Sequence, residues 1–111
     1  MTVVVKVLIP AKIAEATQTT QYTANGVTTI IDKFTATNYS ASAATISVNL
    51  VTAADTAGNQ NLITKTKTLQ PAEVYTFPEL VGQVLMASGF ISTIAGTATS
   101  INIRASGREV S

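Results

Sequence analysis

The chain has 111 residues, a length that suits one domain with a single modest core. Hydrophobic residues make up 46% of the sequence and charged residues only 12%, against a usual charged share of about 25%. His, Cys and Trp are absent, which excludes His- or Cys-based zinc and copper sites, thiol nucleophiles, disulfides and Ser-His-Asp triads. The net charge of +1 comes from scattered Lys and Arg, without the basic stripe typical of nucleic-acid-binding domains, so we expect no nucleic-acid partner.

β-Branched residues dominate the composition. Thr occurs 19 times and Val with Ile 21 times, so these residues fill 40 of the 111 positions. Their stiff side chains suit a pleated sheet better than a helix. No apolar run approaches the ~20 residues of a membrane helix, and no signal peptide is recognisable. The sequence therefore predicts an all-β protein made in a reducing cytoplasm, with no membrane partner.

The first ten residues predict a β-strand. Four apolar residues alternate along one face of it: Val3, Val5, Val7 and Ile9. Pro10 cannot donate to a sheet ladder, so this strand either ends there or runs along an edge, as an N-terminal arm or edge strand over residues 1–10. Because the run is so apolar, we expect a neighbouring molecule to cover it by adding a strand to the sheet edge.

The next two segments predict a β-hairpin. Gln18–Ala24 and Val27–Ala36 are both rich in β-formers, and Asn25-Gly26 between them suits a type I′ turn. Asp32 falls on the apolar side of the second segment, which predicts a bulge or a partly exposed strand end.

Two further strands follow a small polar loop over residues 38–42. Ile46, Val48 and Leu50 alternate with Ser47 and Asn49, and this alternation predicts a half-buried strand. Residues 52–61 have the composition of a long exposed connection, and Leu62–Leu69 is again a strand. Lys65 and Lys67 within it predict a solvated face that protects the strand from aggregation.

The last third of the chain predicts one helix and two strands. After a turn at residues 70–73 and a short strand over 74–77, apolar residues recur at helical spacing, and Pro78 with Glu79 suits a helix start. We therefore predict a two-turn helix over Pro78–Met86. The final strands are expected at Ile91–Ala95 and Ser100–Ala105, and residues 106–111 form a polar tail or a short edge strand.

These segments together predict a single domain over residues 1–111. Seven to eight short strands with turn signals between them, and one short helix near residues 78–86, are typical of an antiparallel β-sandwich, either jelly-roll or Ig-like.

Candidate catalytic and metal-binding groups are few. Asp32 is the one carboxylate that the pattern places in a partly buried position, and a hydrogen-bonded structural Asp at a strand end explains it without a glycosidase-like partner. Asp55, Asn59 and Asn61 offer oxygen atoms to a calcium ion but lack the dense acidic spacing of a calcium loop. We predict no catalytic residue, no metal and no cofactor, and hence no enzyme.

The six aromatic residues leave one alternative open. Phe34 and Phe77 are expected in the core. Tyr39 lies in a loop and is the one ring that suits an exposed site, so a carbohydrate-binding module for host attachment is a further hypothesis, although one ring makes a poor platform.

The segment Leu69–Leu85, LQPAEVYTFPELVGQVL, resembles one found in small β-sandwich virion proteins of tailed bacteriophages. In that group a Pro-Gly-Glu turn leads into a strand, a short helix ending in Leu, and a Gly-Asp turn. Three further runs are similar to that group: Tyr22–Ala24, Phe34–Asn38 and Ser106–Glu109. The resemblance covers residues 18–110. The sequence departs from the group at Ala72, where Gly is common, and at Phe90, where Asp is common.

This resemblance implies a non-enzymatic protein of a phage virion, made in the cytoplasm of the bacterial host. The leading hypothesis is a capsid decoration (cement) protein that binds the lattice of the major capsid protein in many copies; the second is a neck or tail accessory protein. A low charged fraction with a mean hydropathy of +0.33 also predicts a surface covered by other virion proteins or by copies in a homo-oligomer. The predicted partner interface consists of Val3, Val5, Val7, Ile9 and Phe90.

Overall fold

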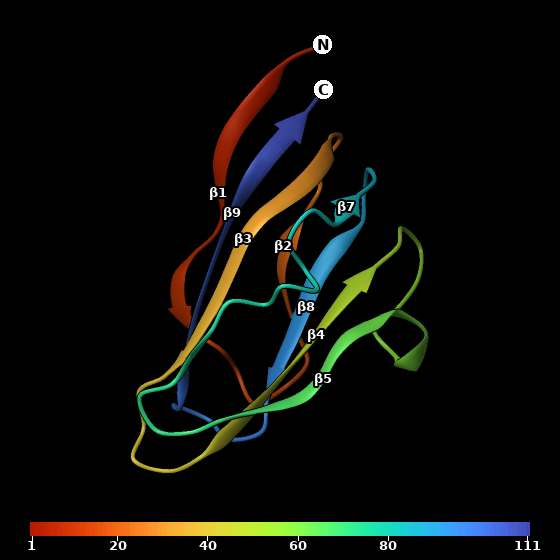
Figure 1. The fold of residues 1–111 in the computed structure, drawn as a ribbon. Helices are drawn as coiled ribbons and strands as arrows, with labels where there is room; N and C mark the ends of the chain where they lie inside the picture. The colour runs from red at the N-terminus through yellow and green to blue at the C-terminus, as the bar shows by residue number, and fades with distance from the viewer.

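A computed structural model describes residues 1–111 and arranges nine strands in two antiparallel sheets (Figure 1). The strands are β1 (Val3–Ile13), β2 (Thr19–Thr23), β3 (Thr28–Asn38), β4 (Ala44–Val51), β5 (Leu62–Leu69), β6 (Val74–Tyr75), β7 (Val84–Leu85), β8 (Phe90–Ala95) and β9 (Ile101–Val110). One 3-10 turn, Asn59–Asn61, interrupts the connection between β4 and β5.

The strand order identifies the kind of sandwich. One sheet has the order β1-β9-β3-β6, with β7 also paired to β3, and the other has the order β2-β8-β4-β5. If β6 and β7 count as one interrupted edge strand, this is the order of two Greek keys, which defines a jelly roll. The predicted β-sandwich is confirmed, and of its two predicted forms the strand order is that of the jelly roll.

The core lies between the two sheets and contains 20 buried hydrophobic residues. Phe34 of β3 and Phe77 are fully buried, as predicted, and their ring centroids are 4.7 Å apart in an edge-to-face arrangement. The ring of Tyr75 lies 4.6 Å from that of Phe77. This geometry is favourable for aromatic pairs and anchors β6 to β3.

The predicted hairpin between β2 and β3 is wrong, although both strands exist. They lie in different sheets, because β2 pairs with β8 and β3 pairs with β9. Gly26 has a φ of 72°, but Asn25 lacks the positive φ that a type I′ turn needs at both residues. Each strand carries apolar residues on one face, and the chain buries both faces by crossing the core. Tyr22 of β2 then meets Thr29 of β3 across the core, with 2.6 Å between their hydroxyl oxygens.

The predicted helix over Pro78–Met86 is also wrong. Two successive turns replace it, closed by N–H groups of Leu80 and Gln83, and Gly82 has a φ of 85°. Ile31 of β3 accepts a hydrogen bond from the Gly82 N–H and donates one to the Gln83 carbonyl. The backbone groups that a helix would use internally are therefore used by the sheet. None of the helical turns of the structure could span a membrane.

Residues 106–111 do not form a tail. Strand β9 continues to Val110 between β1 and β3 and is the strand that joins them. The N-terminal segment is confirmed as an edge strand, which passes through Pro10 with register shifts before and after Ile9. The bulge predicted at Asp32 is confirmed by the register shift between Ile31 and Lys33.

Strand β4 contains the five residues predicted for it, Ile46–Leu50, and β5 has the predicted ends. The polar face of β4, however, is not solvated. Ser47 accepts the Thr66 N–H at 2.7 Å, and Asn49 donates to the Gly58 carbonyl at 2.9 Å. The connection over residues 52–61 and strand β5 therefore cover a face that the alternation had predicted to be exposed.

Candidate functional site

Strand β1 leaves one side of its backbone unpaired. It pairs with β9 alone, at the margin of its sheet (Figure 1). Thr2 and Ser111 exchange both backbone hydrogen bonds, at 2.8 and 2.9 Å, and the register then runs one to one as far as Val7 opposite Ser106. Hydrogen-bonded and non-hydrogen-bonded pairs alternate in an antiparallel ladder. Val4 and Lys6 therefore bond to β9.

The intervening residues direct their N–H and C=O groups away from the sheet: Val3, Val5 and Val7. Their side chains lie on the outer face of the sheet and are 51%, 83% and 42% exposed. An open edge and an apolar face thus coincide on one short segment. Such an edge can pair with another strand.

The apolar face continues from β1 across the neighbouring strands at the end of the sheet near the termini. One cross-strand row runs from Val5 through Arg108 and Ile30 to Val84 of β7, and the next contains Val3 and Val110. We call the outward apolar residues of these rows, with Val7, the valine face: Val3, Val5, Val7, Ile30, Val84 and Val110. Val84 is 50% exposed, whereas its strand neighbour Leu85 points into the core.

Arg108, the cation in the row of Val5, is neutralised within the sheet, whereas Lys33 lies opposite Ser106 in the row of Val7. Arg108 holds the Asp32 carboxylate with two nitrogens, Nε at 3.0 Å and Nη2 at 2.9 Å. The hydrogen bond and the charge of Asp32 raise the pKa of Arg108 above its usual value. Asp32 is exposed, rather than partly buried as predicted, and the bulge turns it toward this partner. The pair lets an apolar face carry an arginine without net charge.

The other half of the same outer face is polar. Its rows contain Thr35 opposite Arg104, and Thr37 opposite Asn102. Val74 of β6 lies beside Thr37 and is 54% exposed, so it is an apolar residue in polar surroundings. The outer face is therefore divided into an apolar half near the termini and a polar half beyond it.

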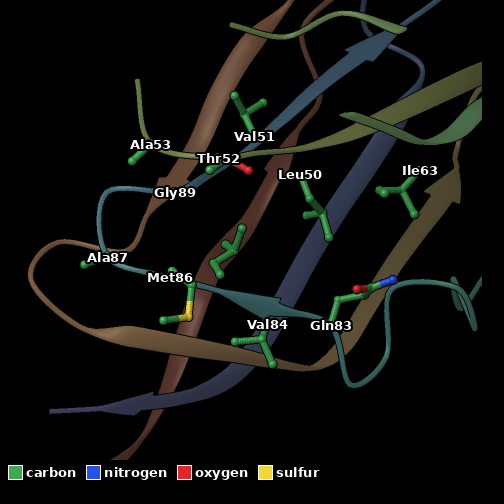
Figure 2. A pocket seen from close by; sticks show the side chains of 11 residues that line it. Leu50, Val51, Thr52, Ala53, Ile63, Gln83, Val84, Met86, Ala87 and Gly89 are labelled. Carbon is green, nitrogen blue, oxygen red and sulfur yellow. The ribbon is translucent and has the colours of Figure 1, made fainter. Parts of the chain in front are cut away.

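An open pocket of about 270 Å³ adjoins β7 at the end of the sandwich. Figure 2 shows Met86 and Val84 on one side of it, with Leu50 and Ile63 opposite. Eight of its eleven lining residues are hydrophobic and none is charged. Val84 belongs to both the pocket lining and the valine face. The polar side chains of this pocket are those of Thr52 and Gln83, and the pocket continues the apolar contact surface beyond Val84.

The predicted interface residues do not all come together. Val3, Val5 and Val7 share the valine face, but Ile9 is 1% exposed, because the bulge after Val7 turns it into the core. Phe90 is half-buried in β8 of the other sheet. Three members of the face were not predicted from the sequence: Ile30, Val84 and Val110. The available signal was the Ile30-Ile31 pair, since two successive isoleucines in a strand place an apolar residue on each side of the sheet.

The buried hydroxyl cluster beneath β1 is built around Glu109. Its carboxylate accepts hydrogen bonds from the Tyr22 hydroxyl and, at 3.2 Å, from Lys6 Nζ. The Tyr22 hydrogen bond, followed by that of Lys6, lowers the pKa of Glu109 despite partial burial. Burial and the neighbouring Glu109 raise the pKa of Tyr22 to about 12. Both pKa shifts favour an ionised Glu109 carboxylate beside a neutral Tyr22 phenol. The pair has a structural role, because it links β9 of one sheet to β2 of the other.

A second cluster joins β5 to the segment after β6. Glu79 accepts the Tyr75 hydroxyl at 2.6 Å and also the Thr64 hydroxyl, and Lys67 Nζ lies 4.9 Å from the centre of the Tyr75 ring. The Glu79 hydrogen bond, followed by burial, raises the pKa of Tyr75 to about 12. Lys65 is exposed as predicted, whereas Lys67 is half-buried over this ring.

The predicted loop positions stay apart from both clusters. Asp55 accepts hydrogen bonds from the side-chain amides of Gln60 and Asn61, at 3.3 to 3.4 Å. The Asp55 carboxylate is thus hydrogen-bonded to amide groups. No group of three His, Cys, Asp or Glu side chains in the protein is placed to hold a metal ion. Tyr39 is half-exposed and belongs to neither aromatic pair. The valine face, with the edge of β1, is the feature best suited to a function.

Comparison with known proteins gives no family for the chain. No protein-family model, no curated protein and no solved structure matches it.

Proposed function

We propose that this chain is a non-enzymatic structural protein of a phage virion, and that it acts as a capsid decoration (cement) protein. In this role many copies bind to the lattice of the major capsid protein. The observation that carries the proposal is the valine face, where six outward apolar residues from four strands surround a neutralised ion pair. Exposed apolar patches of this kind mark protein-protein contacts in soluble proteins.

Three further features support an attachment role. The jelly-roll order recurs in viral capsid proteins, an analogy of fold and not of function. The resemblance of Leu69–Leu85 and Ser106–Glu109 to virion proteins is independent of the valine face. The carboxylates of Glu109 and Glu79 both accept hydrogen bonds from tyrosine hydroxyls, which gives these two glutamates a structural role. A small contact repeated across a lattice gains avidity from the number of copies.

The test is a binding experiment with capsid shells that lack the protein. We expect the purified chain to bind in hundreds of copies per shell and to raise the temperature at which shells release their contents. A dozen or fewer copies would place it at the neck or tail instead. Absence of binding, with no gain in heat resistance, would reject the proposal.

A matched pair of variants tests the face itself. Val84→Asp puts a charge on the valine face, and Val74→Asp puts one on an equally exposed valine in the polar half of the same outer face. We expect Val84→Asp to weaken shell binding at least tenfold and Val74→Asp to leave it within about twofold, because a desolvated charge is costly only inside an apolar contact. Equal effects would contradict the assignment of the face.

A further inference from the structure

We propose that two copies of this chain pair through their β1 strands into a dimer with two-fold symmetry, in the antiparallel register centred on Val5. The proposal concerns the chain by itself and does not depend on a role in a virion. It follows from the state of the sheet edges, from the direction of the free backbone groups and from the charges beside them.

The four sheet margins differ in how they are protected against strand pairing. On the first sheet, β6 and β7 are two residues long. On the second, β5 carries Lys65 and Lys67 and two register shifts along its pairing with β4, and β2 is a polar five-residue strand with a bulge. Short strands, lysines and bulges all discourage edge-to-edge pairing.

Strand β1 has such protection only in its second half. Its two register shifts follow Val7, and Pro10 lies beyond the first of them. The first half, Val3–Val7, is regular, largely valine and paired on one side alone. Lys6 is the one charged residue in it, and Glu109 of β9 holds it in an ion pair at 3.2 Å. This half of the margin is therefore open to a partner strand.

The free backbone groups determine the register of a pairing between two copies. Only Val3, Val5 and Val7 direct their N–H and C=O groups outward, so these residues must face one another. In the antiparallel register centred on Val5, Val5 faces Val5 of the second copy and Val3 faces Val7. Each of these three pairs exchanges two hydrogen bonds, which satisfies every outward group of the segment. The segment is thus complementary to itself.

The charges fit the same register. Lys6 faces Val4 of the second copy, and Val4 pairs on its other side with Glu109. Each lysine therefore lies in one cross-strand row with the carboxylate of the other copy, and no two like charges face each other directly. Lys6 is 49% exposed at the side chain, so it can turn toward either carboxylate. Complementary charges of this kind help to fix the register of an interface.

The resulting symmetry joins the two valine faces. Pairing of two edge strands within one sheet puts the two-fold axis perpendicular to that sheet, so both outer faces lie on the same side. The dimer then presents one continuous apolar surface, with Val3, Val5 and Val7 of both copies at its centre. A partner with repeated binding sites would be engaged twice, which deepens the proposed lattice role without being needed for it.

The register is tested by cysteine cross-linking, since the chain has no cysteine of its own. In the proposed dimer the two Val5 Cα atoms are about 5.5 Å apart, which is within disulfide range. The two Val3 Cα atoms are separated by four residues along the strands, or about 13 Å. We expect oxidised Val5→Cys to become a covalent dimer and Val3→Cys to cross-link at least tenfold more slowly. Equal rates for the two variants would overturn the register.

Sedimentation equilibrium of the purified chain tests the dimer itself, with two variants at Val5. Val5→Pro removes an outward N–H but none of the bonds to β9, so we expect the variant to fold and to be a monomer of 11.5 kDa. Val5→Thr keeps the N–H and the shape of the side chain, and should still dimerise.

A parent chain that stays monomeric at millimolar concentration would overturn the proposal and leave the edge to a strand of another protein. A dimer unaffected by Val5→Pro would also overturn it. Neither result bears on shell binding by Val84→Asp, so the two proposals fail separately.

Discussion

At the scale of single residues, Gly107 is the glycine with the least space for a side chain. A Cβ atom there would lie 2.1 Å from the carbonyl oxygen of Ile30 and 2.9 Å from Leu8 Cδ1. The oxygen belongs to the backbone of β3, which is held in the ladder with β9 and cannot move aside. We expect Gly107→Ala to lower the free energy of unfolding by about 2–4 kcal/mol, measured by urea denaturation.

Gly96→Ala is the matched control for this prediction. A Cβ atom at Gly96 would also be too close to a neighbour, Thr45 Oγ1 at 2.3 Å, but that oxygen can rotate away with its side chain. The loss of stability should therefore be clearly smaller than for Gly107→Ala. A similar loss at both positions would show that the backbone contact at Gly107 is not the cause.

The role of Gly107 is not visible in the sequence. The run Ser-Gly-Arg-Glu has the composition of a polar tail, and the same small and charged residues also suit a central strand whose charges are all paired. Whether the run forms a tail or a central strand depends on the ion-pair partners of Glu109 and Arg108. These partners are Lys6, 103 residues away, and Asp32, 76 residues away. The same limit explains why Val3, Val5 and Val7 were identified as interface residues, while Val84 and Val110 were not.

At the scale of elements, folding depends more on strand β9 than on strand β1. Strand β9 is bonded on both sides, to β1 and β3, and Glu109 ties it to the second sheet through Tyr22. We expect deletion of residues 106–111 to abolish folding, and deletion of residues 1–5 to leave a folded chain of lower stability. Dispersion of amide signals in a proton-nitrogen NMR spectrum measures both outcomes. A folded chain after the first deletion would contradict the central position of β9.

The elements that could be predicted are those whose structure is determined by residues close together in the sequence. The alternation over Leu62–Leu69 and the turn signals around it were sufficient to locate β5. The pairing of strands is not local: Asn25-Gly26 suits a hairpin equally well whether or not the two flanking strands find better partners in opposite sheets. The helical spacing over Pro78–Met86 failed for a similar reason, because Ile31 of β3 binds the backbone on both sides of Gly82.

At the scale of the whole molecule, the absence of histidine shapes the response to pH. No side chain has its ordinary pKa between about 5 and 8, so stability should be nearly constant over that range. On the acid side, hydrogen bonds lower the pKa of three glutamates in the folded state. Glu15 is lowered first by Lys12 and then by Gln21, and Glu109 by Tyr22. For Glu79, burial acts to raise the pKa, but the hydrogen bonds of two hydroxyls outweigh it.

The sign of the acid effect follows from linkage. A carboxyl group with a lowered folded pKa adds stability that is present above its unfolded pKa, about 4.3 for Glu, and is lost as the pH falls through the folded value. We therefore expect the urea midpoint to fall steadily below about pH 4. Glu109→Gln should lower the midpoint at pH 7 and flatten the acid decline. An unchanged acid decline in this variant would contradict the assignment.

On the alkaline side, two tyrosines should dominate the loss of stability. Burial and Glu109 raise the pKa of Tyr22 to about 12, and Glu79 and burial do the same for Tyr75. A group whose folded pKa is raised adds stability that is complete below its unfolded pKa, about 10 for Tyr, and is lost as the pH rises through 12. The expected loss for the buried Tyr22 is on the order of 2 kcal/mol.

The double variant Tyr22→Phe, Tyr75→Phe tests the role of these two phenols. It removes both phenols but keeps the rings in the core, where Phe77 contacts Tyr75. Urea midpoints measured from pH 8 to 12 should then fall less steeply than in the parent chain, while the acid decline persists through Glu15. Both hydroxyls donate hydrogen bonds to glutamates that link the two sheets. The change in urea midpoint therefore also measures how much these links stabilise the sandwich. If the parent and the variant decline in parallel above pH 10, the phenols of Tyr22 and Tyr75 do not control alkaline stability.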